Sequence, residues 1–274
     1  MRRPRSYIGN PVKISTMKTC IVIIPIYKKE FDENEENCVV RYFHVLQGEK
    51  IAFVGPEHLD TSYYEKKFPE GVIERFPDAF FKGILGYNKL MLSEKFYERF
   101  LSYDYMLIAQ PDATILQNEN RLQEFMALDY DYIGAPWDPA RRIWEWSLAK
   151  KENGKGYRIR CCKKEGDGIV MGNGGFSLRK VIPCKNLVRA HGWRKIYWYI
   201  KRNEDIFFGV LGRDNRIGFK LADIETGFQF AREYQLKENL AKGNVPFGVH
   251  GYQKEFASYQ EMDSYMKEVG KPLL

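Results

Sequence analysis

The stretch CIVIIPIY, residues 20–27, decides the fold. It is continuous, rich in β-branched residues and ended by the charged run 28–30, which is typical of a strand buried on both faces of a parallel sheet. The pattern then alternates, with further strands predicted at 51–55, 72–76 and 105–109 and helices between them at 32–47 and 84–100. This alternation predicts an α/β fold, a mixed but mainly parallel sheet flanked by helices, with a Rossmann-like first half.

In such sheets ligands collect at the carboxyl ends of the strands, so we expect Tyr27 and Asp112 to lie near each other. No glycine-rich phosphate loop follows the first strand, which argues against a dinucleotide-dependent dehydrogenase and a P-loop kinase. In the second half of the chain, strands and helices alternate less regularly. A short strand and a Gly/Pro turn are predicted within 129–139, and a mobile polar loop over 140–168. Without a repeat or a linker, one domain over 18–274 is expected, after a flexible basic extension at 1–17 in which Met17 is an alternative start.

Composition narrows the function classes. Of the 274 residues, 43 are basic and 36 acidic, and the net charge of +7 suits an anionic ligand or an anionic membrane surface. The basic residues are interleaved with acids, so nucleic acid is not expected as a partner. Five cysteines without CxxC spacing predict reduced thiols in a cytoplasmic protein. The longest apolar runs are far shorter than the ~20 residues of a membrane span.

Two segments place polar groups where a ligand would bind. Asp112 follows an apolar strand and a proline, so its carboxylate should emerge at the sheet edge as an oxygen ligand for Mg²⁺ or Mn²⁺, or serve in an ordinary turn. The glycines of GNGG (172–175) allow close approach of the backbone to a carbohydrate or phosphate, or form a tight turn before a strand.

Asn203, Glu204 and Asp205 precede an apolar run and predict a helix start, with Asn203 as its N-cap. One of the two acids is alternatively a general base, which the spacing does not assign. His250, between a valine and a glycine, is either a satisfied polar group or a ligand of a metal or diphosphate. The segment 190–202 interleaves aromatic and basic residues and predicts an amphipathic helix on the sheet, or an interfacial patch for a lipid-linked acceptor.

Five segments in this order resemble the glycosyltransferases of the GT-A fold, and more closely an uncharacterised bacterial GT-A-like family: QPDA (110–113), DYIGAPW (131–137), GNGGFSLR (172–179), NEDIFFG (203–209) and PFGVHG (246–251). The resemblance extends from about Lys18 to Tyr252. The third and fourth segments are also similar to the GGG-aromatic and EDV-aromatic segments of inverting β-1,3-galactosyltransferase-type enzymes.

The resemblance implies an enzyme that moves a sugar from a nucleotide diphosphate sugar, with UDP as the expected carrier, to a hydroxyl of a glycan or lipid-linked glycan. It implies inversion at the sugar carbon and a place in bacterial surface polysaccharide synthesis, in the cytoplasm with peripheral contact to the inner face of the plasma membrane. The resemblance also implies roles for single residues. Asp112 and His250 would bind Mn²⁺ or Mg²⁺, and Asp205, with Glu204 as second candidate, would be the catalytic residue. The nucleotide would be bound by Tyr27, Asn88, Gln110, Asp112 and Trp137, and the donor sugar and acceptor would be contacted by Asn173, Gly174 and Gly175.

Gln110 departs from the family pattern, since it stands where the DxD motif has its first acid. It contributes no charge, so metal independence stays open, with Arg141 or Arg142 neutralising the diphosphate. The alternative to an enzyme is a catalytically silent sugar- or nucleotide-binding module on the same fold. Residue types alone leave the sugar, base, acceptor, linkage and oligomeric state open.

Overall fold

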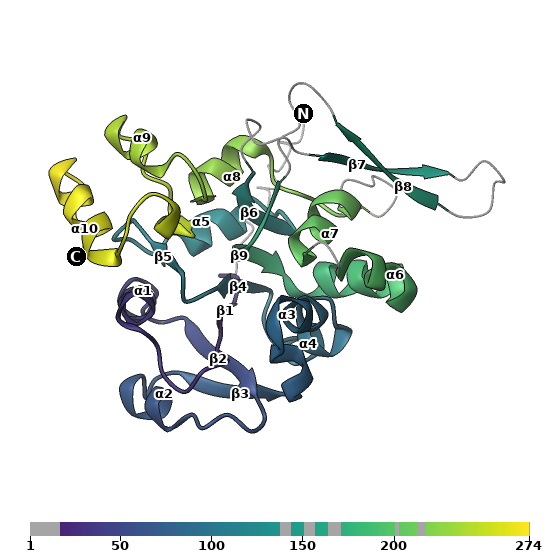
Figure 1. Cartoon of the computed structure of the whole chain (residues 1–274), viewed down its shortest axis with the longest axis horizontal. Helices are drawn as coiled ribbons and strands as arrows, with labels where there is room; N and C mark the ends of the chain where they lie inside the picture. The colour runs from purple at the N-terminus through teal and green to yellow at the C-terminus, as the bar shows by residue number, and fades with distance from the viewer. Residues whose placement is uncertain are drawn as a thin grey trace, which may run out of the picture.

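The computed structural model describes residues 17–137, 144–150, 157–163, 171–200, 203–212 and 218–273 (Figure 1). The predicted basic extension, apart from Met17, and the pair Arg141 and Arg142 lie outside these ranges. No helix in the described part of the chain combines the length and the apolar character that crossing a bilayer requires.

A six-stranded sheet forms the centre of the molecule, in the order β3-β2-β1-β4-β9-β6. Its strands are β1 (Cys20–Pro25), β2 (Lys50–Pro56), β3 (Val72–Phe76), β4 (Tyr105–Ala109), β6 (Tyr132–Pro136) and β9 (Met171–Lys180). β9 runs antiparallel to both of its neighbours, whereas β1 to β4 pair in parallel. The predicted α/β class with a mainly parallel sheet is therefore confirmed.

The apolar run of β1 is explained by its central position. β1 pairs with β2 on one side and with β4 on the other, so that Ile23 lies between Ala52 and Ile108. All six residues of the strand are buried. Since both faces are covered, apolar side chains point both ways, and the sequence shows no alternation.

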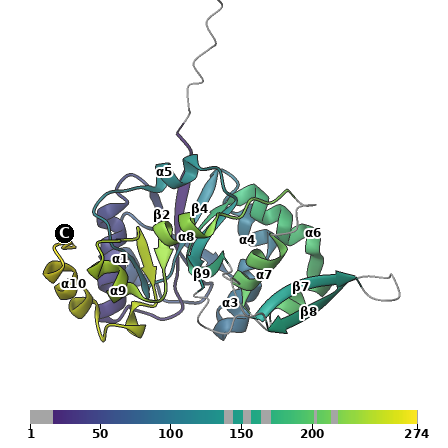
Figure 2. The same cartoon turned by 90° about the horizontal axis from the view of Figure 1, so that it is seen from above.

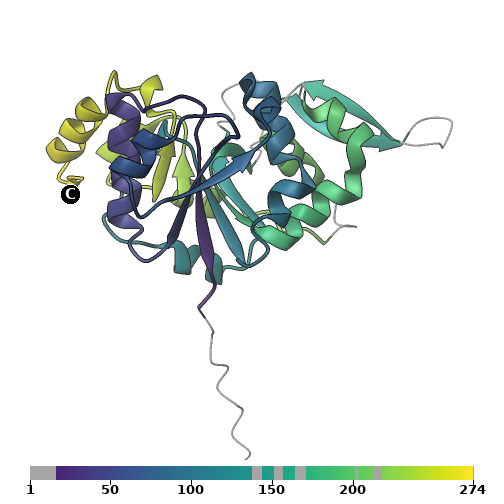
Figure 3. The same cartoon turned by 90° about the horizontal axis from the view of Figure 1, so that it is seen from below.

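Helices cover both faces of the sheet, as Figure 3 shows, with α1 and α10 on one side and α3, α4 and α6 on the other. Their bounds are α1 (Glu33–Val45), α2 (Ser62–Lys67), α3 (Gly83–Met91), α4 (Glu94–Glu98), α5 (Leu122–Ala127), α6 (Val181–Ile200), α7 (Glu204–Leu211), α8 (Ile224–Phe230), α9 (Leu236–Ala241) and α10 (Tyr259–Glu268), with short 3-10 turns η1 (Asp78–Phe81) and η2 (Tyr252–Lys254). The predicted start of α1 is confirmed, because Asp32 and Glu35 form a reciprocal capping box there.

Two predictions differ from the structure. The helix expected over 84–100 is two helices, α3 and α4, because the chain breaks at Leu92 and Ser93. The polar loop expected over 140–168 contains a hairpin of β7 (Trp144–Lys150) and β8 (Tyr157–Lys163). The segment WEWSLAK alternates large apolar and polar residues, which is a strand signal that its overall polarity concealed.

A small second sheet connects the C-terminal part of the chain to the end of β4. It contains β5 (Ala113–Ile115), β10 (Ala231–Arg232) and β11 (Gly248–His250), in the order β10-β11-β5. β11 is antiparallel to β5, with His250 opposite Ala113. The following chain packs α10 beside α1 (Figure 2). This sheet therefore brings His250 next to Asp112.

Candidate active site

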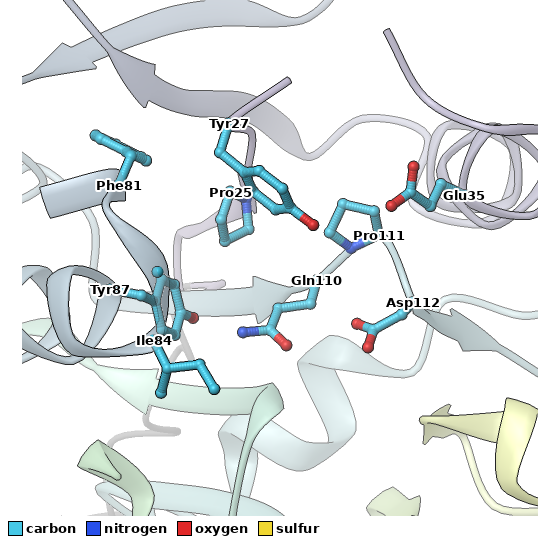
Figure 4. A pocket seen from close by; sticks show the side chains of 10 residues that line it. Pro25, Tyr27, Glu35, Phe81, Ile84, Tyr87, Gln110, Pro111 and Asp112 are labelled. Atoms are coloured by element: carbon cyan, nitrogen blue, oxygen red, sulfur yellow. The ribbon is translucent and has the colours of Figure 1, made fainter. Parts of the chain in front are cut away.

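A pocket of about 510 Å³ lies at the carboxyl ends of β1 and β4 (Figure 4). Rings and an isoleucine form one part of its wall: Tyr27, Phe81, Ile84 and Tyr87. Tyr27 exposes 63% of its surface, so its ring is available to a ligand. Flat apolar groups around an open space suit the stacking of a nucleobase or the C–H face of a sugar.

Polar groups form the rest of the wall, and Figure 4 shows Gln110 and Asp112 facing the same space below Tyr27. His250 Nε2 lies 3.2 Å from Gln110 Oε1 and 3.5 Å from Asp112 Oδ1. The backbone supports this arrangement, since Gly251 N–H donates to Asp112 O at 3.1 Å. The predicted neighbourhood of Tyr27, Asp112 and His250 is therefore present in the structure.

The pKa of Asp112 reflects this position. Burial acts to raise the pKa, but the hydrogen bond and charge of His250 outweigh burial and hold it below its usual range. The other imidazole nitrogen, Nδ1, is buried and has no hydrogen-bond partner among the described residues. Asp112 thus keeps a carboxylate at the rim of the pocket.

The residues present fit a hard divalent cation. Nε2 of His250 faces two oxygens, so either a proton or a cation at this position would satisfy them. Within the described ranges no group of three or more His, Cys, Asp or Glu side chains is arranged to hold a metal. Two protein ligands and an amide oxygen suit an ion that takes its remaining ligands from phosphate and water.

Two glycines of β9 make room for these side chains. A Cβ atom on Gly175 would lie 2.3 Å from His250 Nε2 and 2.7 Å from Gln110 Oε1. A Cβ atom on Gly174 would lie 1.9 Å from Glu204 Oε1. At these two positions the groups that come close to the glycine backbone are protein side chains. The glycines lie within strand β9, and not in the tight turn that was the alternative.

Glu204 is locked by a buried ion pair. Its Oε1 lies 3.0 Å from Arg179 Nη2, and the two side chains expose 4% and 0% of their surface. The guanidinium carbon is 5.2 Å from the ring centre of Tyr132 and 5.0 Å from that of Phe208. Burial acts to lower the pKa of Arg179, but the charge of Glu204 and the neighbouring tyrosines together outweigh burial and raise it.

Asp205, the next residue, is buried, and among the described residues no cation pairs with it. Its Oδ1 accepts a hydrogen bond from Ile206 N–H at 2.7 Å. Burial raises the pKa of Asp205 well above its ordinary value, and the charges of Glu204 and Glu233 add to the rise. Once ionised, a buried carboxylate with a raised pKa accepts a proton more strongly than a free one.

The start of α7 differs from its predicted cap. Asn203 occupies the N-cap position with φ of 102°, but its side chain makes no capping bond. Instead the side chain of Asn88, on α3, accepts a hydrogen bond from Glu204 N–H at 3.1 Å. Asn88, predicted to bind nucleotide, therefore contacts the backbone of the predicted catalytic helix.

The remaining predicted residues lie around β9. Asn173 Oδ1 accepts from Gly175 N–H at 2.8 Å and so fixes the irregular backbone there. The ring of Trp137 packs on Gly172, where a Cβ would lie 2.9 Å from it. Neither residue is among those that line the described pocket with Tyr27.

Sequence reasoning missed three charged residues of this region: Arg179, Glu233 and Lys254. Glu233 is paired with Lys254, and Tyr234 OH donates to Glu233 Oε1 at 3.2 Å. An arginine inside the buried strand β9 signals a buried acid partner, which would have pointed to Glu204. Glu233 and Lys254 belong to none of the motifs singled out in the sequence.

A family model described as "Protein of unknown function (DUF5672)" matches residues 71–250. A search of curated proteins finds no match. Among solved structures, the chain is similar to the mannosyltransferase Ktr4p from S. cerevisiae, with 11% identity and a TM-score of 0.45 over 71% of this chain and 65% of that one. It is also similar to the apo-form glycosyltransferase GlyE of Streptococcus pneumoniae TIGR4, with 10% identity and a TM-score of 0.45 over 85% of this chain and 54% of that one. The chain thus spans about half to two thirds of the length of these two proteins.

Proposed function

This chain belongs to the DUF5672 family, whose function is unknown, and we propose that it is a glycosyltransferase that uses a nucleotide diphosphate sugar. The observation that carries the proposal is the 3.5 Å approach of His250 Nε2 to Asp112 Oδ1 at the rim of the pocket that Tyr27 lines. An aromatic-walled pocket beside a cation-binding edge suits a nucleoside with a diphosphate. The resemblance of five sequence segments to GT-A glycosyltransferases suggests the reaction class.

Asp112 and His250, with Gln110 Oε1 beside them, would hold Mn²⁺ or Mg²⁺, which when bound supplies Lewis-acid stabilisation to a leaving diphosphate. Tyr27 orients the base by stacking. UDP is the expected carrier, and the acceptor is a hydroxyl of a glycan or lipid-linked glycan.

Asp205 takes the proton from the acceptor hydroxyl. The acceptor oxygen forms a bond to C1 of the donor sugar, the bond from C1 to the diphosphate oxygen breaks, and the nucleoside diphosphate leaves with that electron pair. The proton stays on Asp205, whose raised pKa favours this step, and direct attack inverts the configuration at C1. Glu204 is not the base, since Arg179 already holds Oε1 of its carboxylate as a buried ion pair.

The test is thermal-shift screening of the protein against UDP, GDP, CMP and dTDP, each with Mn²⁺, Mg²⁺ or EDTA. A ligand at 100 times its Kd adds about 2.7 kcal/mol to the free energy of unfolding. We expect stabilisation by UDP that EDTA abolishes, followed by release of UDP from UDP-sugars. No stabilisation by any nucleotide overturns the proposal. Binding without transfer or hydrolysis, over a broad panel of acceptors, would identify a silent binding module instead.

A further inference from the structure

Two carboxylate oxygens near the proposed catalytic base are buried and lack hydrogen-bond partners among the described residues: Glu204 Oε2 and Glu233 Oε2. The side chain of Glu204 exposes 4% of its surface and that of Glu233 exposes 9%. Leaving a buried polar atom unsatisfied typically costs about 1–3 kcal/mol, more for a charged group. Two such atoms in one region therefore indicate a binding site for a ligand that supplies the missing donors.

Glu233 is next to the proposed cation-binding residues in the small second sheet. It follows β10, which pairs in parallel with β11, so it comes beside His250. The charge of Glu233 also adds to the raised pKa of Asp205. On β9, Gly175 lies against His250 and Gly174 lies against Glu204, so Glu204 lies one residue along that strand from the side chain that Glu233 flanks.

The chemistry of this region points to a neutral ligand with hydroxyl groups. Each carboxylate already has a cation, Arg179 for Glu204 and Lys254 for Glu233, so no further positive charge is needed. The acids are not grouped as metal ligands within the described ranges. What each carboxylate lacks is a hydrogen-bond donor on its second oxygen, and hydroxyl groups of a sugar are such donors.

We propose that Glu233, together with Glu204, forms the subsite that binds hydroxyl groups of the acceptor sugar beside Asp205. This inference rests on the proposed function, because it names the acceptor side of the same site. In it, Glu233 Oε1 is held by Lys254 and Tyr234, while Oε2 accepts from a sugar hydroxyl.

The substitution Glu233→Gln tests the subsite with little change in shape. Lys254 and Tyr234 both donate to the ε1 position, so the amide oxygen stays there and the NH₂ group takes the ε2 position. A donor then stands where the sugar brings its own donor. A hydrogen bond to a charged group contributes about 1.5–3 kcal/mol, so we expect affinity to fall about ten- to hundredfold.

The probes are methyl β-D-glucopyranoside, methyl β-D-galactopyranoside and methyl N-acetyl-β-D-glucosaminide, measured by saturation-transfer NMR on the whole chain with UDP present. We expect saturable binding of at least one glycoside to the wild type and its loss in Glu233→Gln. Glu225→Gln, the control, removes the same charge from an exposed position in the first turn of α8 and should bind within threefold of the wild type.

UDP stabilisation separates the two proposals. If UDP stabilises both wild type and Glu233→Gln, but no glycoside binds or the variant binds it equally well, the subsite is overturned and the proposed function stands. If UDP does not stabilise the wild type, the proposed function fails and the subsite fails with it.

Discussion

Glu204 Oε1 lies 3.0 Å from Arg179 Nη2, and neither side chain has appreciable contact with solvent. The arginine also donates through Nε to Ser177 Oγ at 2.9 Å. The pair thus joins the first turn of α7 to the strand that carries Gly174 and Gly175. A buried pair of this kind fixes geometry, since a single partner left behind is strongly destabilising.

Replacing Arg179 by methionine should lower the free energy of unfolding by about 3–5 kcal/mol, because Glu204 would remain as a buried, unpaired carboxylate. The double variant Arg179→Met with Glu204→Gln should recover part of this loss. Urea denaturation followed by circular dichroism measures both. A decrease in the free energy of unfolding of less than about 1 kcal/mol in the single variant would show that the ion pair does not hold the two elements together.

Asp205→Asn should reduce sugar transfer by about 10²–10⁴, the usual contribution of a general base. The variant should still be stabilised by UDP, because Asp205 is not among the residues lining the described pocket. Initial rates with UDP-sugar and acceptor measure the loss. Full turnover in a folded, UDP-binding variant would remove Asp205 from the mechanism.

Asp205→Asn should also change how stability depends on pH. The folded-state pKa of Asp205 is raised, so ionising it in the folded protein costs free energy that the unfolded chain does not require. The contribution of Asp205 to the free energy of unfolding is fully present below its pKa in the unfolded chain, about 3.9, and it is lost as the pH rises through its higher pKa in the folded protein. The asparagine variant, which can still accept from Ile206 N–H, should be more stable than wild type at neutral pH and equal to it near pH 3. Thermal melts across this range test the sign, and a less stable variant at neutral pH would contradict it.

Gly175→Ala should abolish the metal dependence of UDP binding, because the new Cβ would lie 2.3 Å from His250 Nε2 and displace the ring from Asp112. Overpacking of this kind costs about 1–3 kcal/mol in stability as well. Gly174→Ala is the matched variant: it presses on Glu204 Oε1, so it should lose comparable stability but keep metal-dependent UDP binding. Thermal shifts with UDP and Mn²⁺ or EDTA compare the two, and the same metal response in both variants would refute the prediction.

Tyr27→Ala should weaken UDP binding by roughly tenfold or more, since stacking of a base on an aromatic side chain contributes about 1–3 kcal/mol. Tyr27→Phe keeps the ring and should stay within threefold of wild type. Isothermal titration calorimetry gives both affinities. Equal loss in the two variants would assign the effect to the hydroxyl group, and no loss in either would place the base elsewhere.

The sequence predicted the centre of the sheet well because β1 and β4 are buried along their whole length. Continuous apolar runs such as β1 and β4 have no other common explanation at that length, and their observed bounds agree with the predicted ones within two residues. The break at Ser93 and the β7–β8 hairpin were missed, since a short interruption and a polar strand leave weak periodicity. Strand order is not encoded in local pattern, so the antiparallel direction of β9 could be seen only in the structure.

The site was predicted in part. Asp112 and His250 were paired through sequence resemblance, and the structure brings them together across 138 positions of the chain (250 − 112) through β5 and β11. Arg179 and Glu233 were not found in the sequence. A buried charged residue is recognised by its oppositely charged partner, and partners far apart in the sequence form no local motif. Asn203 was a sound N-cap by residue type, but a side chain from another helix supplied the bond.

That bond, from Glu204 N–H to the side chain of Asn88, has a mechanical consequence. Asn88 is adjacent to Tyr87, which forms part of the pocket wall, so α3 lines the pocket with one residue and contacts the first turn of α7 with the next. Asn88 and Glu204 are 116 residues apart in the sequence, and this single hydrogen bond connects the helix that lines the pocket to the helix that carries Asp205.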